Sequence, residues 1–425
     1  MSILSLLKSS GVRNFAKLLS ANVVAQIIGL VVYPILTRMY APEHFGLLNL
    51  FLSIGGVLVI VSCAEYYYAI VLPKDNRSAS NVLGVGLMWL LVVTGLIAVS
   101  VLFAGPISVL FKSPDLASYY WMMPLYVFAV GAWNLLNYWY IRHKEYNPVS
   151  RYQVSQNIFS SVGKLSLGSA GVMQGGMIYS VVVAPLLSLT TSVLGCRKKL
   201  VESMREISWH DMRKQALEYR NFPVFVLPRS FVNMLAGQMP VLLLTPFFGA
   251  KAVGFLSVAI LLGYTPIGTI TRAIYQVMYQ NTMERVHQSL PIGAIFRKFL
   301  VYASVVIVPV FAALWFVLPD LTAWLLGDEW YVSGEYIRWM LPWLYVSLLS
   351  CSINYLFDVF MKQKWGLIFE VMLAVMRVIG LVIGVLANSF VLAIICYSLA
   401  TALALVVQIV WMLTQVRQYD CSLPV

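Results

Sequence analysis

Three basic side chains lie inside long apolar stretches of the sequence: Lys164, Arg229 and Arg377. A charge at bilayer depth is costly, so such a residue usually faces a water-filled path or a partner of opposite charge. Both lysine and arginine bind phosphate oxygens strongly, and arginine does so through two parallel hydrogen bonds. The three positions therefore predict a cationic path for an anionic substrate. The alternative at each position is an internal ion pair or a side chain that reaches the membrane surface.

Polar residues accompany these cations at helical spacing. Asn157 shares a helix face with Lys164, Asn233 follows Arg229 by one turn, and Gln26 lies on a polar stripe of the first apolar run. Residues on one face of a helix can line one path. We therefore predict a substrate-binding set of Lys164, Arg229, Arg377, Asn157, Asn233 and Gln26.

Three carboxylates are candidates for binding a coupling ion, either H⁺ or Na⁺. Glu65 and Asp358 lie near the ends of apolar stretches, and Glu370 precedes Arg377 by two helical turns on the same face. Acidic groups inside a membrane often relay protons. The alternative is that each is neutralised by a nearby lysine or arginine, which for Glu370 would be Arg377.

Composition gives the class of protein. Hydrophobic residues make up 60% of the chain and charged residues only 11%, whereas a soluble domain is about half apolar and about a quarter charged. Stretches of about 20 apolar residues span a bilayer. The sequence therefore predicts an all-α polytopic membrane protein with about twelve transmembrane helices. The expected spans are 15–36, 45–69, 82–104, 119–140, 152–173, 176–195, 222–248, 252–276, 298–318, 336–357, 366–387 and 389–413.

The basic residues orient these spans. If the N-terminus is cytoplasmic, 22 of the 29 lysines and arginines fall in cytoplasmic segments, 4 fall on the opposite face and 3 lie inside helices. An excess of basic residues on the cytoplasmic side is the rule for membrane proteins. This predicts that both termini are cytoplasmic. It also explains the net charge of +12 without a nucleic-acid partner, because the charges are spread between apolar runs.

The two halves of the chain resemble each other. The sequence Trp121-Met122-Met123-Pro124 recurs as Trp339-Met340-Leu341-Pro342, and other short matches keep a similar offset. A parallel repeat of six helices is a transporter architecture. We predict an N-terminal bundle at 1–195, a basic cytoplasmic linker at 196–221 and a C-terminal bundle at 222–425. The linker is expected to be amphipathic and to lie on the membrane surface.

Motifs for catalysis are absent from the sequence. It contains neither a GxxxxGK[ST] phosphate loop nor an HExxH zinc motif, and its cysteines lack metal-ligand spacing. We therefore expect a transporter rather than an enzyme, with no metal, no catalytic residue and no organic cofactor.

Several motifs resemble those of Wzx-like oligosaccharide flippases, which belong to the polysaccharide biosynthesis family of the multidrug/oligosaccharidyl-lipid/polysaccharide (MOP) exporter superfamily. They are Tyr219-Arg220-Asn221-Phe222-Pro223, Gln238-Met239-Pro240-Val241-Leu242-Leu243-Leu244, Leu36-Thr37-Arg38-Met39-Tyr40-Ala41-Pro42-Glu43-His44-Phe45-Gly46 and Glu65-Tyr66-Tyr67-Tyr68-Ala69-Ile70-Val71-Leu72-Pro73. The resemblance covers essentially the whole chain. One departure is Cys63-Ala64 before Glu65-Tyr66, where the family often has a basic residue, and this puts a role for Glu65 in doubt.

The resemblance implies a MATE-like fold of two six-helix bundles in a V around a central cavity. It implies that undecaprenyl-pyrophosphate-linked oligosaccharide moves from the cytoplasmic to the periplasmic leaflet of a bacterial inner membrane, for O-antigen or other surface polysaccharide synthesis. Transport would proceed by alternating access driven by an ion gradient, beside membrane lipid, a polysaccharide polymerase and a chain-length regulator. The alternatives are a related exporter of lipid II, of a teichuronic-type precursor or of drugs, and a membrane polymerase. A polymerase should carry arginines in large periplasmic loops, whereas the largest outer loop here, 319–335, holds mainly acids.

Overall fold

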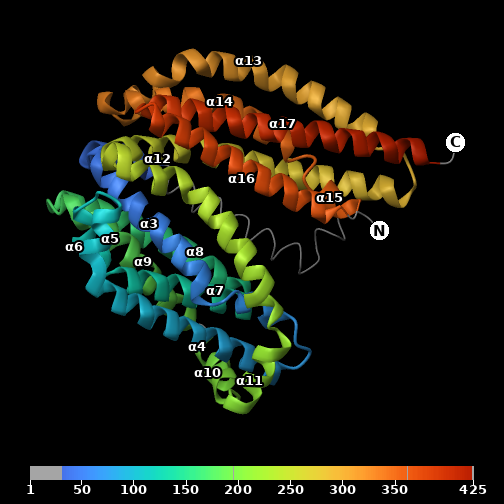
Figure 1. Ribbon diagram of the computed structural model, residues 1–425. Coiled ribbons are helices and arrows are strands. Elements are labelled where there is room, and N and C mark those ends of the chain that lie inside the picture. Colours follow the sequence, from blue (N-terminus) through green and yellow to red (C-terminus); the bar gives the residue numbers. More distant parts are fainter. Residues whose placement is uncertain (1–30, 195, 361, 424–425) are drawn as a thin grey trace. The chain divides into compact units, whose positions relative to one another are not determined.

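The computed structural model describes residues 31–194, 196–360 and 362–423. The chain forms two compact units, one ending at Lys251 and the other beginning at Ala252. Within the described residues every regular element is a helix, which confirms the all-α prediction (Figure 1). The division into bundles at 1–195 and 222–425, with a linker between them, stays a prediction.

The first unit contains a helical stretch at 31–39 and the elements up to the middle of α12. Their bounds are α3 (Pro42–Ser62), η1 (Tyr66–Val71), α4 (Asn76–Ser100), η2 (Val101–Phe103), α5 (Ala104–Leu110), α6 (Asp115–Tyr120), α7 (Met123–Arg142), α8 (Tyr146–Ser169), α9 (Met173–Leu194), α10 (Arg197–Arg205), α11 (Trp209–Glu218), η3 (Phe222–Val226) and α12 (Leu227–His287).

The second unit begins with residues 252–287 of α12 and continues to the C-terminal helix. The remaining bounds are α13 (Gly293–Leu326), η4 (Asp328–Trp330), α14 (Tyr331–Ser350), α15 (Leu356–Val359), α16 (Gln363–Leu386) and α17 (Phe390–Ser422).

Seven helical segments of the described chain are long and apolar enough to cross a membrane: Pro42–Ser62, Asn76–Leu110, Met173–Leu194, Phe222–Val286, Gly293–Leu326, Gln363–Leu386 and Phe390–Ser422. The segment Phe222–Val286 contains two expected spans, 222–248 and 252–276. The less apolar expected spans coincide with α7, α8 and α14. Most of the first expected span, 15–36, lies outside the described residues.

Small residues let α3 and the first part of α12 approach closely, as they do at many membrane helix interfaces. A Cβ atom on Gly46 would lie 1.8 Å from the carbonyl oxygen of Ala250. Further along α3, the hydroxyl of Ser53 donates a hydrogen bond of 2.8 Å to Oε1 of Gln238. Gly46 contacts Ala250, whereas Ser53, which comes later in α3, contacts Gln238, which comes earlier in α12. The two segments therefore run antiparallel.

Gly249 interrupts α12 between its two expected spans. Its backbone has φ 81° and ψ 171°, whereas its neighbours are helical. A positive φ is accessible to glycine without the steric cost of a Cβ. The break therefore ends the first span of α12, and the chain passes into the second unit just after it.

In the second unit, α16 packs closely against α17. A Cβ on Gly384 would lie 2.2 Å from the Cα of Ala393, and one on Gly380 would lie 2.7 Å from the carbonyl oxygen of Cys396. Such contacts bring the two backbones together, and they place Arg377 of α16 beside residues of α17.

Candidate functional site

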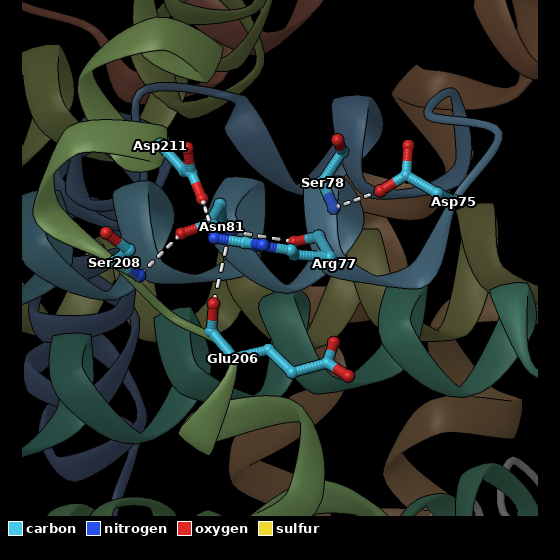
Figure 2. Close-up of polar contacts among 7 residues, drawn as sticks. All are labelled: Asp75, Arg77, Ser78, Asn81, Glu206, Ser208 and Asp211. Carbon is cyan, nitrogen blue, oxygen red and sulfur yellow. Dashed lines mark hydrogen bonds and ion pairs between the residues drawn. The ribbon is translucent and has the colours of Figure 1, made fainter.

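Two short linker helices, α10 and α11, are fixed to α4 by a buried asparagine. The amide of Asn81, which is fully buried, donates to the carbonyl oxygens of Arg77 (2.9 Å) and Glu206 (3.4 Å). Its Oδ1 accepts a hydrogen bond of 2.8 Å from the backbone N–H of Ser208, between the two linker helices. An ion pair of 2.8 Å joins Arg77 to Asp211 above this contact (Figure 2). The linker is thus part of the first unit.

The end of α4 that receives the linker is itself capped. The carboxylate of Asp75 accepts a hydrogen bond of 2.7 Å from the backbone N–H of Ser78, as an N-cap residue does (Figure 2). That hydrogen bond lowers the pKa of Asp75. Arg142 of α7 donates to the carbonyl oxygens of Pro73 (2.7 Å) and Asp75 (3.0 Å). Several elements are therefore joined at this end of the unit.

Apolar contacts complete the docking of the linker. Met212 of α11 is buried in a cluster with Tyr66 and Val85, and Leu227 packs against the same cluster. The hydroxyl of Tyr66 donates a hydrogen bond of 3.1 Å to the carbonyl oxygen of Ala216. The linker has a face packed on the unit, and it leads directly into the start of α12.

A second set of contacts lies where α10 begins. The carboxylate of Glu145 accepts hydrogen bonds from the thiol of Cys196 (2.6 Å) and from the ammonium group of Lys199. These hydrogen bonds lower the pKa of Glu145. Burial and the neighbouring carboxylate raise the pKa of Cys196 to about 11. The thiol therefore stays protonated over the ordinary pH range.

Glu65 is fully buried in a strained turn between α3 and η1. Its φ is 62° and that of Ala64 is 46°, both in the left-handed region that disfavours residues with a Cβ. Neither carboxylate oxygen makes a hydrogen bond. The polar groups that act on it are the hydroxyls of Tyr67 and Ser230 and the guanidinium of Arg229, but none has hydrogen-bonding geometry. A buried carboxylate without a hydrogen bond is costly to keep charged.

Arg229 and Asn233 occupy exposed positions at the start of α12. They follow η3, a π-helical turn that contains Pro223. The opposite part of the helix packs on α3, where Met234 lies against Gly56. The predicted pair therefore points away from α3, and Arg229 also contributes to the electrostatic surroundings of Glu65.

Lys164 and Asn157 are half-buried on one face of α8. The opposite face packs on α9: the hydroxyls of Ser155 and Thr191 lie 3.2 Å apart, and a Cβ on Gly163 would lie 2.8 Å from Oγ of Ser180. The face that carries Asn157 and Lys164 therefore points away from α9, and its role in lining a path stays a prediction. Within the described residues no salt bridge joins Lys164 to an acidic side chain.

Arg377 in the second unit is held by aromatic rings. Its guanidinium carbon lies 5.9 Å from the ring centre of Trp343 and 5.8 Å from that of Tyr397, and its Nε donates to the hydroxyl of Thr401 (3.4 Å). Cation–π contacts of this kind stabilise an arginine away from water. Glu370 is exposed and forms no ion pair with Arg377 in the described structure.

Two predicted residues cannot be placed. Gln26 and the side chain of Asp358 lie outside the described part of the structure. Among the described residues, no three His, Cys, Asp or Glu side chains are grouped to hold a metal ion. The sequence patterns do not single out Asn81, which holds the linker on α4. A polar asparagine near the start of an apolar helix could have indicated such a buried contact.

The described helices, several of them long and apolar enough to cross a membrane, define a multi-pass, all-helical membrane protein. The structure is similar to an inward-facing multidrug resistance MATE family transporter of the MOP superfamily, with 16% identity, 93% of this chain and 96% of the other covered, and a TM-score of 0.74. It is also similar to the lipid II flippase MurJ in an inward closed conformation (12% identity, 94% and 89% covered, TM-score 0.64). A third neighbour is a MOP superfamily transporter from Pyrococcus furiosus whose binding pocket is described as having reverse polarity (15% identity, 99% and 99% covered, TM-score 0.61).

At sequence level, residues 35–335 match the family model described as "Polysaccharide biosynthesis protein". The match covers well over half of the chain, so the protein belongs to the polysaccharide biosynthesis family. No curated protein sequence matches the chain.

Proposed function

We propose that this protein flips undecaprenyl-pyrophosphate-linked oligosaccharide from the cytoplasmic to the periplasmic leaflet of a bacterial inner membrane. Family membership over residues 35–335 is the observation that carries the proposal. Both termini would be cytoplasmic, and the exported units would pass to a polysaccharide polymerase and a chain-length regulator. The fold supports transport rather than catalysis, because its solved neighbours are transporters.

The predicted cations suit this cargo. A pyrophosphate carries negative charge that must lose hydration on its way through the membrane, and basic side chains can replace the lost water. Lys164 offers a half-buried ammonium group that has no acidic partner in the described structure. Arg229 offers an exposed guanidinium. Asn157 and Asn233 lie beside them with groups that can bind sugar hydroxyls.

Glu65 is the carboxylate best suited to couple transport to an ion gradient. Its burial without a hydrogen bond favours uptake of a proton, and a sodium ion is the other candidate. The nearby charge of Arg229 would then link the ion to the substrate, because substrate phosphate and Glu65 would compete for the same guanidinium. Glu370 and Asp358 remain further candidates.

A second cargo, lipid II, is favoured by the similarity to MurJ. Both cargoes are polyprenyl pyrophosphates that carry sugars, so the same cations would serve either. The identity of the sugar decides between them.

Deletion of the gene followed by complementation tests the proposal. A flippase mutant should accumulate lipid-linked oligosaccharide on the cytoplasmic leaflet, and the wild-type gene should restore surface polysaccharide. Accumulation of lipid II would favour the second cargo, and accumulation of neither would refute both.

Point variants then test the cationic path. Lys164→Ala and Arg229→Ala should insert normally but fail to complement, whereas Lys164→Arg and Arg229→Lys should complement in part because they keep the charge. Surface polysaccharide at wild-type level in both alanine variants would contradict the role of these cations.

A further inference from the structure

The part of α12 in the second unit, residues 252–287, has two exposed faces of different chemistry. At 3.6 residues per turn, Tyr264, Tyr275 and Tyr279 fall within about 60° of one another around the helix. Ile270 and Val277 lie on the opposite side. All five side chains are exposed. The side that carries Ile270 and Val277 suits contact with lipid. The side that carries the three tyrosines therefore faces surroundings other than lipid.

Polar residues continue the tyrosine side around the helix. Arg272 and Thr265 occupy the adjoining positions, about 20° and 40° around the helix from Tyr279, and Arg272 is exposed. A polar face on a membrane helix is costly against lipid, and such a face usually lines water-filled space. We call Tyr264, Tyr275 and Tyr279 with these two residues the tyrosine face.

The rings on this face are held in place by their neighbours. Tyr264 stacks on the buried Trp343, with ring centres 5.6 Å apart and planes inclined by 14°. Tyr275 and Tyr279 are parallel within 2°, at 6.1 Å. Both stand edge-on to the buried Tyr355, at 5.5 and 5.2 Å. Fixed rings lose little entropy when a ligand binds.

Tyrosines are also common in the belts where a membrane protein meets the headgroup layer. A belt, however, occupies one level of the membrane, and each headgroup layer is only about 5–8 Å thick. From Tyr264 to Tyr279 the helix rises by roughly 22 Å, at about 1.5 Å per residue. The tyrosine face therefore extends too far along the membrane normal to be a single belt.

We propose that the tyrosine face is a binding track for the sugar rings of the transported oligosaccharide. A sugar ring has an apolar face of C–H groups, which packs on an aromatic ring, and a rim of hydroxyls. Thr265 and Arg272 can hydrogen-bond to that rim. A length of roughly 22 Å accommodates several sugar units rather than one. This proposal rests on the proposed function. It assigns recognition of the sugar to the tyrosine face and binding of the pyrophosphate to the cations described above.

Binding of two probes to the purified full-length protein in lipid nanodiscs tests the track. One probe is the lipid-linked oligosaccharide extracted from the deletion strain, and the other is undecaprenyl pyrophosphate without sugar. Tyr264→Ala and Tyr275→Ala should each raise the Kd for the first probe roughly fivefold, a loss typical of one aromatic contact. The Kd for the second probe should not change, which also shows that the variants are folded.

Two further variants sharpen the test. Tyr275→Phe keeps the ring and should bind both probes as the wild type does. Val277→Ala, on the lipid side of the same helix, should also leave both Kd values unchanged. The track is refuted if the tyrosine-to-alanine variants bind the sugar-bearing probe normally, or if Val277→Ala weakens it equally. A deletion strain that accumulates no lipid-linked sugar would instead overturn the proposed function, and the track with it.

Discussion

The docking of the linker on α4 depends more on the buried Asn81 than on the charged residues around it. The variant Asn81→Ala removes the acceptor of the Ser208 N–H and the donor to the Glu206 carbonyl. Ser208 is half-buried, and leaving a donor away from water unpaired costs about 1–3 kcal/mol. Glu206 is exposed, so water can reach its carbonyl, and the loss falls mainly on Ser208. We therefore expect Asn81→Ala to weaken the docking by about 2 kcal/mol.

The ion pair between Arg77 and Asp211 provides a matched control in the same contact. The Arg77 side chain is 68% exposed and that of Asp211 is 27% exposed. Surface ion pairs of this kind contribute about 0–1 kcal/mol. Arg77→Ala should therefore loosen the linker by less than roughly fivefold, whereas a loss of about 2 kcal/mol in Asn81→Ala corresponds to roughly 30-fold.

Native-state proteolysis measures this difference. Trypsin cleaves after Arg205, next to the contact made by Glu206, and the bond becomes accessible when the linker leaves α4. With the protein in nanodiscs, cleavage at this bond should be roughly 30-fold faster in Asn81→Ala than in the wild type, provided that reclosing is faster than cutting. Equal acceleration in Arg77→Ala would show that charge holds the linker, and unchanged cleavage in Asn81→Ala would show that the buried amide contributes nothing.

Two other regions give contrasting outcomes. Gly46→Ala should strongly reduce the yield of folded protein in detergent chromatography, because its Cβ would collide with the carbonyl of Ala250, whereas Gly95→Ala meets no atom within 4 Å and should express normally. In a variant whose only thiol is Cys196, Glu145→Gln should lower the thiol pKa from about 11, because the carboxylate that disfavours the thiolate is gone. Alkylation at pH 8.5 should then be faster; an unchanged rate would attribute the raised pKa to burial alone.

The membrane spans could be predicted because a bilayer requires each one to be apolar over about 20 residues. The ends of the helices could not be predicted in this way, because hydropathy detects contact with lipid and not helical backbone. The span expected at 252–276 is part of a helix that continues to His287. Likewise the span expected at 336–357 starts later than α14, which begins at Tyr331.

For the candidate site residues, too, some features could be predicted from the sequence and others could not. Spacing alone placed Asn157 and Lys164 on one face of α8, because that relation is set by helix geometry. The surroundings of Arg377 depend on rings from α14 and α17, which no local pattern specifies. The same holds for Glu65, whose burial follows from packing of distant segments. Tertiary contacts therefore decide which charged residues are paired.

One series of contacts connects the linker to the buried carboxylate. Asn81 holds the segment between α10 and α11 on α4. The hydroxyl of Tyr66, the residue after Glu65, then bonds to the carbonyl of Ala216 in α11. Because α11 leads into α12, the docked linker also fixes where Arg229 lies relative to Glu65. The linker therefore helps to set the charge environment of the proposed ion-binding group.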